Sequence, residues 1–278
     1  MTQFPHFTNR YFCAKLLSME IKALPAYLER SPLVEAIWEI RFNVNPALSI
    51  GDLLPGIVFV HLDAHRKGYV LNQLPFVQIP RDIIDTNENF KFQAKYRIES
   101  TKSPYLYHIG EHMVSLNCRK PYEGWGAFKN KIIELIGILK RAPFEFIDVK
   151  PSLRYINFLP QNVIPSLSPW LRIKLNIGDF PITMTPVQIR AELPETECTH
   201  TVQIVHPAQL VMHEADLENK GIIVDIDSVL NSTQHSLDDT VAQIEMLHAK
   251  NKEFFFNQIL TEDAIEKFGP RYTEEAGI

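Results

Sequence analysis

Two acidic residues in the second half of the chain have the spacing of a metal-dependent site. Asp225 and Asp227 lie in the segment GIIVDID, and in a strand residues two apart point to the same side. Paired carboxylates of this kind hold divalent cations in phosphoryl-transfer enzymes. A third acid is needed, and the sequence does not place Glu214 or Asp216 beside the pair. We therefore favour a solvated strand end and keep a metal-dependent enzyme or nucleotide binder as an alternative.

A second candidate set is basic. Lys91, Lys95 and Arg97 alternate along a predicted strand, and Arg119 and Lys120 follow later in the chain. Such a face could bind the phosphates of RNA or single-stranded DNA. The same residues could form a charge ladder with acidic side chains of a neighbouring strand. We favour the ladder, because nucleic-acid surfaces are strongly basic whereas this chain has a net charge of -5.

Two glycines, Gly124 and Gly126, lie on either side of Trp125, between a predicted strand and a predicted helix. Free N-H groups at the start of a helix can bind an anion. The glycines match neither the dinucleotide-binding fingerprint nor a phosphate-binding P-loop. We favour a turn that lets Trp125 enter the core, with an anion site as the alternative.

Arg154, Tyr155 and Asn157 form the remaining polar set. In a strand Arg154 points away from the other two side chains, so the three cannot form one cluster. We expect an interdomain polar contact here, in which Arg154 forms an ion pair between the two halves of the chain.

The sequence contains no recognisable catalytic or cofactor motif. It lacks G-x-S-x-G and H-E-x-x-H, and Cys118 has no identifiable histidine and acidic partners. His61 and His65 share a helix face without a third ligand, and the other histidines are scattered. We expect ordinary histidines throughout, and we predict no catalytic residue, no cofactor and no metal ligand set.

The composition is that of an ordinary globular protein. The chain has 278 residues, 45% hydrophobic and 22% charged, which excludes a disordered tail and a disulfide scaffold. Its three cysteines are widely spaced without a C-x-x-C pair, as is typical of a reducing compartment. No segment has the pattern of a signal peptide or the apolar length of a membrane span. We therefore expect a cytoplasmic protein without membrane contact.

Charge is distributed unevenly along the chain. Up to Pro160 there are 20 Lys and Arg against 15 Asp and Glu, and from Gln161 onward there are 8 against 18. The first half therefore carries +5 and the second -10. These opposite charges predict that the halves attract each other, within one chain or between copies in a homo-oligomer.

Hydrophobic periodicity predicts the elements that position these residues. The first half indicates a strand over 34 to 42, a helix within 46 to 68, strands over 90 to 100 and 105 to 118, a helix over 122 to 141 and a strand over 152 to 159. The second half indicates strands over 171 to 177, 185 to 193, 200 to 206, 209 to 214 and 221 to 227, a helix capped by Ser236 and a short helix over 262 to 268.

These elements predict an α+β fold of two antiparallel sheet-and-helix domains. The first domain, residues 19 to 159, has a ferredoxin-like order of strands and helices. The second, residues 170 to 272, is a β-meander covered by a C-terminal helix. A cleaner start at Met19 suggests that residues 1 to 18 are an extension, disordered or outside the native chain.

Four segments resemble a known protein family. They are SPLVEAIWEIRF at 31 to 42, PYEGW at 121 to 125, LRYIN at 153 to 157, and a tail in which Leu247 and His248 precede FFF and ILTED. In this order they resemble a sporadically distributed bacterial and archaeal family of about 260 residues without an assigned function. The resemblance covers Met19 to about Tyr272 and supplies no catalytic residues. It implies an accessory protein of mobile elements, toxin-antitoxin pairs or phage defence.

Taken as a whole, the sequence predicts a binding or regulatory protein rather than an enzyme. Its expected partner is another protein or a second copy of the same chain. Two alternatives remain open, a divalent-metal enzyme or nucleotide binder at Asp225 and Asp227, and RNA or single-stranded DNA binding on the basic strand face.

Overall fold

The computed structural model describes residues 23–44, 50–62, 68–182, 186–210, 219–232 and 236–272. It confirms the α+β class, with antiparallel strands and a helix near the C-terminal end. The predicted extension lies outside the described residues, as do His65, Glu214 and Asp216. Within the described ranges, no helix has the length and apolar character needed to cross a membrane.

Strands and helices are interspersed along the described ranges, with a run of strands from β7 to β12. The strands are β1 Tyr27–Leu28, β2 Leu33–Val44, β3 Val70–Gln73, β4 Ala94–Glu99, β5 Tyr105–Gly110, β6 Met113–Arg119, β7 Phe146–Pro160, β8 Asn176–Ile177, β9 Phe180–Pro181, β10 Val187–Pro194, β11 Cys198–Leu210, β12 Asn219–Leu230 and β13 Pro270–Arg271. The α-helices are α1 Ile50–Leu62, α2 Arg81–Thr86, α3 Glu88–Lys91, α4 Trp125–Arg141, α5 Leu237–Phe254 and α6 Glu262–Glu266.

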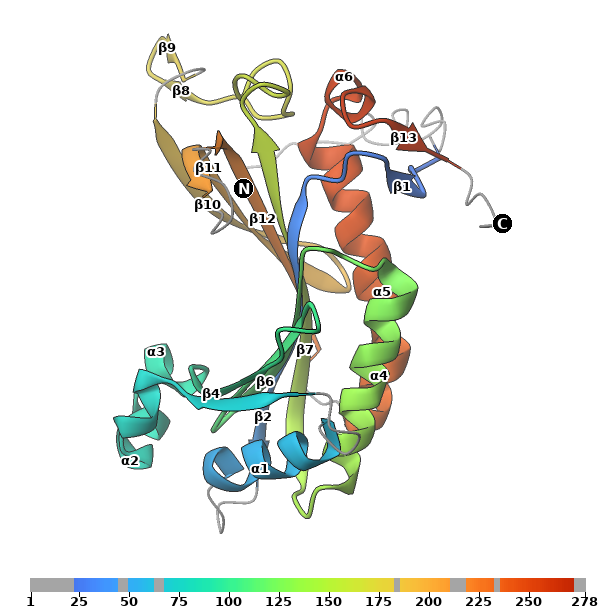
Figure 1. Cartoon of the computed structure of the whole chain (residues 1–278). Coiled ribbons are helices and arrows are strands. Elements are labelled where there is room, and N and C mark those ends of the chain that lie inside the picture. The colour runs from blue at the N-terminus through green and yellow to red at the C-terminus, as the bar shows by residue number, and fades with distance from the viewer. Residues whose placement is uncertain are drawn as a thin grey trace, which may run out of the picture.

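Nine strands form one antiparallel sheet in the order β10-β11-β12-β7-β2-β6-β5-β4-β3 (Figure 1). The 15-residue strand β7 lies at the junction, because it pairs with β2 along one edge and with β12 along the other. The two sheets expected from the sequence are therefore joined into one. Backbone hydrogen bonds connect the two halves of the chain, in addition to any attraction between their opposite charges.

Strand β2 explains why the large helices lie on one face of the sheet. Its side chains alternate as predicted, and the inward set is at most 2% exposed: Ala36, Trp38, Ile40 and Phe42. This inward set packs with residues of α1, α4 and α5, which cover the same side of the sheet in Figure 1. The opposite face of β2 carries polar side chains such as Glu39 and Arg41, which form an ion pair.

The buried side chains form two clusters along the helical face. The first contains residues of α1, α4 and the first turns of α5. The second contains residues of α6 and of a π-helical turn, Phe255–Ile259, which directly follows α5. Helix α5 thus spans both clusters, and it begins at the predicted cap, where Ser236 and Asp239 form a reciprocal capping box.

The strand predicted over 90 to 100 begins later than expected. Glu88–Lys91 forms the short helix α3, in which the ring of Phe90 packs edge-on against Phe76 with centroids 5.3 Å apart. This aromatic contact holds the segment against the preceding turn, so β4 begins only at Ala94 and Lys91 lies outside it.

The second half also differs in its strands. The strand predicted over 200 to 206 and the first residues of that predicted over 209 to 214 belong to one strand, β11, whose register with β12 shifts between Val205 and Ala208. Residues 211 to 214 lie outside the described ranges. The strand predicted over 171 to 177 is reduced to β8 and an isolated bridge at Leu171. The reason is that the Arg172 N-H donates to the Ile259 carbonyl, so this segment follows the C-terminal tail instead of a neighbouring strand.

Gly221 marks a close approach between β12 and β7. A Cβ atom at this position would lie 2.3 Å from the Leu159 carbonyl oxygen and 2.7 Å from the Phe158 ring. Because the carbonyl belongs to the backbone of the central strand, it cannot move away without disturbing the sheet. We expect Gly221→Ala to lower the free energy of unfolding by about 1 to 3 kcal/mol, as overpacked sites do, which urea denaturation measures.

A matched control is Gly56→Ala on the exposed side of α1. A Cβ atom there would meet nothing within 4 Å, and alanine is favoured over glycine inside a helix by about 0.5 to 1 kcal/mol. This variant should be slightly more stable than the wild type. A Gly221→Ala protein as stable as the wild type would contradict the close approach.

Candidate functional site

A pocket of about 380 Å³ lies between β7, the first turn of α4 and the end of α5. Small-molecule sites commonly measure roughly 300 to 1,000 Å³. The segment that contains β1 and leads into β2 also contributes to the lining. Six aromatic residues contribute to the lining: Tyr27, Tyr122, Trp125, Tyr155, Phe255 and Phe256. We call this cavity the Asn157 pocket, after a buried polar residue that also lines it.

Two elements position the polar side of the pocket. Tyr155 and Asn157 both enter it from β7, because residues two apart in a strand share a face. Trp125 is the first residue of α4, and Gly124 before it has a φ of 91°. This left-handed conformation favours glycine, and it turns the chain into the helix. Gly124 lines the pocket, whereas Gly126 lies within the first turn of α4.

A chain of contacts runs along one wall of the pocket. The Tyr155 hydroxyl lies 2.9 Å from His248 Nδ1. The His248 ring stacks on Trp125, with centroids 3.9 Å apart and planes 7° from parallel. Trp125 Nε1 donates to Glu245 at 3.0 Å, and Glu245 also pairs with Lys129. These contacts hold side chains of β7, α4 and α5 in one arrangement.

His248, Tyr155 and Tyr122 are uncharged near neutral pH. Burial, with the nearby charge of Lys252, lowers the pKa of His248 to about 4. Burial also raises the pKa of Tyr155 and of Tyr122 well above the usual tyrosine value. A general acid or base works best with a pKa near the working pH, and none of these three groups meets that condition at pH 7.

Asn157 is the polar group that the pocket leaves available. Its side chain is only 5% exposed and lines the cavity. Among the residues that the structure describes, its side-chain amide has no hydrogen-bond partner. Neither of its polar atoms is among the fully buried side-chain atoms that lack a partner. A ligand in the cavity can therefore replace water as the hydrogen-bond partner of this amide.

The π-helical turn Phe255–Ile259 shapes the apolar side of the pocket. Such turns are rare and occur frequently at functional sites. Phe255 and Phe256 lie at its start, are each 7% exposed and line the pocket. The run FFF that follows α5 therefore provides two of the flat walls that a planar ligand would contact.

The structure places Lys95, from the predicted basic set, inside the protein. Lys95 lies where the register of β4 with β5 shifts, between Ala94 and Tyr96, and is 5% exposed. Its Nζ lies 2.8 Å from Glu111 Oε1 and 3.3 Å from Asp52 Oδ1. The shift turns the side chain toward α1 and away from the solvent-facing side of the strand.

The other members of the basic set do not share one face. Lys91 lies in α3, outside the strand, and Arg97 forms an ion pair with Glu99. Arg119 and Lys120 are exposed at the end of β6 and just after it. Glu99 thus compensates the charge of Arg97, and Glu111 and Asp52 compensate that of Lys95. This pairing is of the kind that a charge ladder would give.

Asp225 and Asp227 lie on the face of β12 opposite the large helices. Arg154 of the first half pairs with both carboxylate oxygens of Asp225, with Nε 2.7 Å from Oδ1. Burial raises the pKa of Asp227. A third acid, Glu39, interacts electrostatically with Asp227 but is itself paired with Arg41. The guanidinium groups of Arg154 and Arg41 therefore neutralise the carboxylates that a divalent cation would need as ligands.

Sequence patterns reveal only part of this pocket. Asn157 and Tyr155 belong to a polar set found in the sequence, and Trp125 is predicted as a core residue. The sequence analysis names His248 only as part of a segment that resembles a known family. A single histidine in an amphipathic helix does not by itself indicate a site. The pocket itself is formed by four segments that are spread between residues 26 and 256 of the chain.

Comparison with known proteins assigns no family to the chain. No family model matches it, and no curated protein matches it. The resemblance of four segments to a bacterial and archaeal family therefore stays a prediction.

Proposed function

We propose that this protein is a binding protein whose ligand occupies the Asn157 pocket. The buried side-chain amide of Asn157, which lacks a partner in the described part of the chain, carries this proposal. Its ligand is a small planar molecule with a hydrogen-bonding edge, of about the size of a nucleoside or an aromatic acid.

The lining supports this class of ligand. The rings of Tyr122, Phe255 and Phe256 offer flat apolar surfaces, against which ring systems stack favourably. The Asn157 amide can donate and accept hydrogen bonds at once, which matches the edge of a heteroaromatic ring or an amide. The Lys252 side chain and the positive end of the α4 dipole also border the pocket, so a neutral or anionic ligand is favoured over a cation.

A binding role agrees with the electrostatics of the pocket. The neutral His248 and the protonated tyrosines position a ligand without exchanging protons with it near pH 7. The sequence-based expectation of a binding or regulatory protein is consistent with this site. The expected protein partner or homo-oligomer would engage another surface and stays a prediction.

A thermal-shift experiment with the full chain tests the proposal. The probes are purine and pyrimidine nucleosides, indole and aromatic carboxylates, each added in excess. A ligand that binds the native state raises the melting temperature by mass action. We expect at least one probe to stabilise the wild type and to lose more than half of that stabilisation in Asn157→Ala.

The matched control is Asn72→Ala in β3, at the opposite edge of the sheet from the second half. This variant should keep the full stabilisation by the same probe. The proposal fails if no probe stabilises the wild type, or if the effective probes stabilise Asn157→Ala equally.

A further inference from the structure

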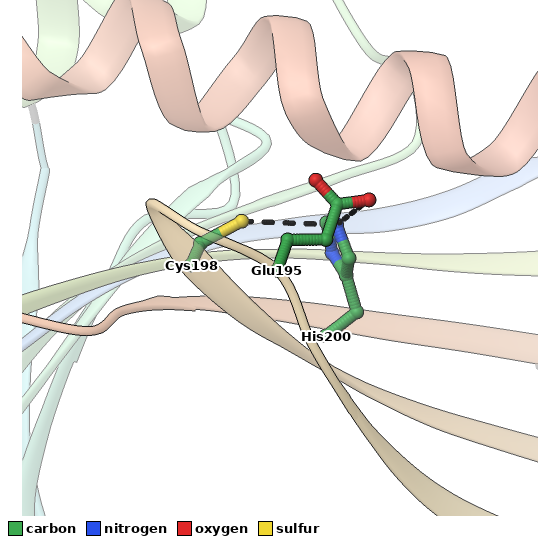
Figure 2. Close-up of side chains that lie close together, drawn as sticks. All are labelled: Glu195, Cys198 and His200. Atoms are coloured by element: carbon green, nitrogen blue, oxygen red, sulfur yellow. Dashed lines mark hydrogen bonds and ion pairs between the residues drawn. The ribbon is translucent and has the colours of Figure 1, made fainter. Parts of the chain in front are cut away.

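Three side chains with metal-binding atoms meet where β10 turns into β11. Figure 2 shows Cys198 and His200 on β11 and Glu195 in the connecting turn, with the three side chains pointing toward one another. Their sulfur, nitrogen and oxygen atoms all lie within 4.8 Å of one another, the one such group of three among the described residues. None of the three residues lines the Asn157 pocket.

The backbone explains why these residues meet. Cys198 and His200 are two apart in β11, so both side chains point to the helical face, where each is completely buried. The Glu195 N-H donates to the Cys198 carbonyl at 2.8 Å and closes the hairpin turn. The turn brings the Glu195 carboxylate over the strand, partly exposed to solvent.

The distances fit a tetrahedral metal centre. Cys198 Sγ lies 3.7 Å from His200 Nε2, and Glu195 Oε1 lies 3.7 Å from the same nitrogen. Zinc bonds of about 2.3 Å to sulfur and about 2.0 to 2.1 Å to nitrogen and oxygen separate such ligand atoms by roughly 3.3 to 3.6 Å. Two of the three separations are therefore within a few tenths of an ångström of those around one ion, and the third, between Cys198 and Glu195, is at most 4.8 Å.

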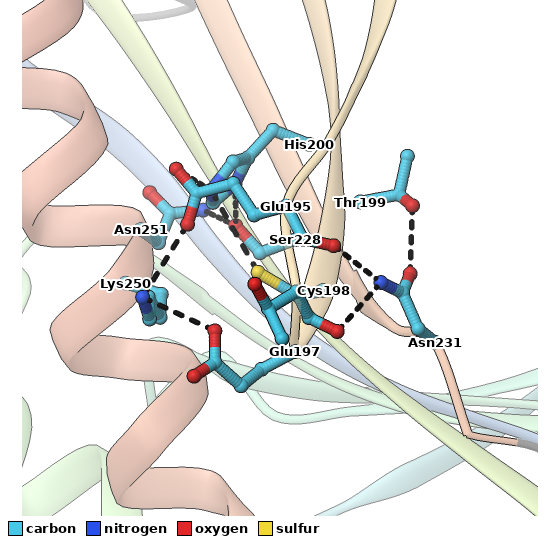
Figure 3. Close-up of polar contacts among 10 residues, drawn as sticks. Glu195, Glu197, Cys198, Thr199, His200, Ser228, Asn231, Lys250 and Asn251 are labelled. Atoms are coloured by element: carbon cyan, nitrogen blue, oxygen red, sulfur yellow. Dashed lines mark hydrogen bonds and ion pairs between the residues drawn. The ribbon is translucent and has the colours of Figure 1, made fainter. Parts of the chain in front are cut away.

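An outer layer of hydrogen bonds orients the histidine. His200 Nδ1 lies 2.8 Å from Ser228 Oγ, which in turn lies 2.8 Å from Asn251 Nδ2 (Figure 3). The Asn251 nitrogen also points at the carbonyls of Leu153 and Ile226, so it is a donor. A hydrogen bond from Nδ1 to the serine leaves the Nε2 lone pair free for a metal, as outer-shell partners do in metalloproteins.

A divalent cation bound here would displace the proton of the Cys198 thiol to solvent and hold the thiolate. It would take the neutral imidazole of His200 through Nε2, the nitrogen that faces Cys198 and Glu195.

The surrounding charges also favour a cation. Glu195, Glu197 and Glu253 all act electrostatically on Cys198 or His200, against one lysine, Lys250. Lys250 Nζ lies 3.4 Å from Glu195 Oε2 and 3.3 Å from Glu197 (Figure 3). It thereby holds the Glu195 oxygen that faces away from His200 and leaves the other oxygen directed at the site.

We propose that Glu195, Cys198 and His200 bind a zinc-type divalent cation, with the fourth coordination position open on the solvent side of Glu195. The mixture of a thiolate, an imidazole and a carboxylate is typical of zinc. A cavity of about 450 Å³, whose lining includes Glu195 and Phe254, lies beside the site and offers an entry path. The Phe254 ring packs on the His200 ring, with centroids 4.3 Å apart.

Metal titration of the chelator-treated full chain tests the site, with Co²⁺ as the spectroscopic probe and Zn²⁺ as the thermodynamic one. We expect one ion per chain, an absorption band of thiolate-to-cobalt charge transfer, and a higher melting temperature with Zn²⁺. Cys198→Ser should abolish the band, and Cys13→Ser and Cys118→Ser should keep it. Glu195→Gln should lower the Zn²⁺ affinity at least tenfold.

Glu195→Gln is the decisive variant because its partly exposed turn position should leave folding intact. Its melting temperature without metal should equal that of the wild type. The proposal is overturned if wild-type protein shows neither the thiolate band nor a Zn²⁺-dependent melting temperature. It is overturned equally if the band survives in Cys198→Ser, or if Glu195→Gln binds Zn²⁺ as tightly as the wild type.

Discussion

Methionine in place of Lys95 is expected to lower the free energy of unfolding by about 3 to 5 kcal/mol, the usual cost of breaking a buried ion pair. The side chains of Lys95 and Glu111 are 7% and 1% exposed. Glu111 accepts hydrogen bonds from Lys95 Nζ and from the Gly51 N-H at the start of α1. The substitution would remove the positive charge and the hydrogen bond that Lys95 provides to this buried carboxylate. Urea denaturation at pH 7 measures the loss.

The pH range of this effect follows from the pKa of Lys95. Burial alone lowers that pKa, but the hydrogen bond and charge of Glu111, with those of Asp52, outweigh burial and raise it above 10.5. A raised pKa in the folded state means that the stabilisation is complete below pH 10.5 and is lost as the pH rises through the folded value. A measurement at pH 7 therefore captures the whole contribution.

The double variant Lys95→Met with Glu111→Leu is the control. Replacing both charges with apolar groups of similar size is often neutral or stabilising, so most of the lost stability should return. A loss below about 1 kcal/mol in Lys95→Met would contradict the buried pair, and so would a double variant as unstable as the single one.

Acid is expected to destabilise the protein through His248 by about 3 kcal/mol between pH 7 and pH 4. The ordinary histidine pKa of 6.5 is lowered to about 4 in the folded state, mainly by burial and then by the Lys252 charge. Below pH 6.5 the unfolded chain binds a proton at this residue and the folded protein does not, so folding becomes less favourable as the pH falls. Each pKa unit corresponds to about 1.4 kcal/mol.

His248→Gln isolates this contribution, because glutamine can hydrogen-bond to Tyr155 without titrating. Urea denaturation at a series of pH values should show a shallower acid loss in the variant than in the wild type. His108 and His200 also have lowered pKa values, but they titrate in both proteins and cancel in the comparison. Parallel curves for the two proteins from pH 7 to pH 4 would contradict the prediction.

The strongest local patterns were enough to predict several elements. The alternation of β2, the apolar stripe of α4 and the Ser236 cap of α5 are local signals, and the structure contains all three. Each arises from contacts among residues close in sequence or from one amphipathic face. The late start of β4 was missed, because the packing of Phe90 on Phe76 overrides the alternating pattern of the segment.

Candidate sites were harder to predict than elements. The alternating pattern predicts Lys95 as an exposed cation on a strand. A single register shift instead places its side chain in the interior beside Glu111. Cys198 and His200 read as unrelated residues, although their spacing of two already puts them on one face of a strand. The missing information is the position of Glu195, which only the closed hairpin turn supplies.

Periodicity and composition were sufficient to predict the α+β class and the buried face of β2, because both depend on local patterns. The pairing of β7 with strands of both halves, and the meeting of Asn157 with the end of α5, appear only in the folded chain. Pairing between distant strands depends on which edges and faces remain unsatisfied after the local elements have formed. That is a property of the assembled chain, and no local segment encodes it.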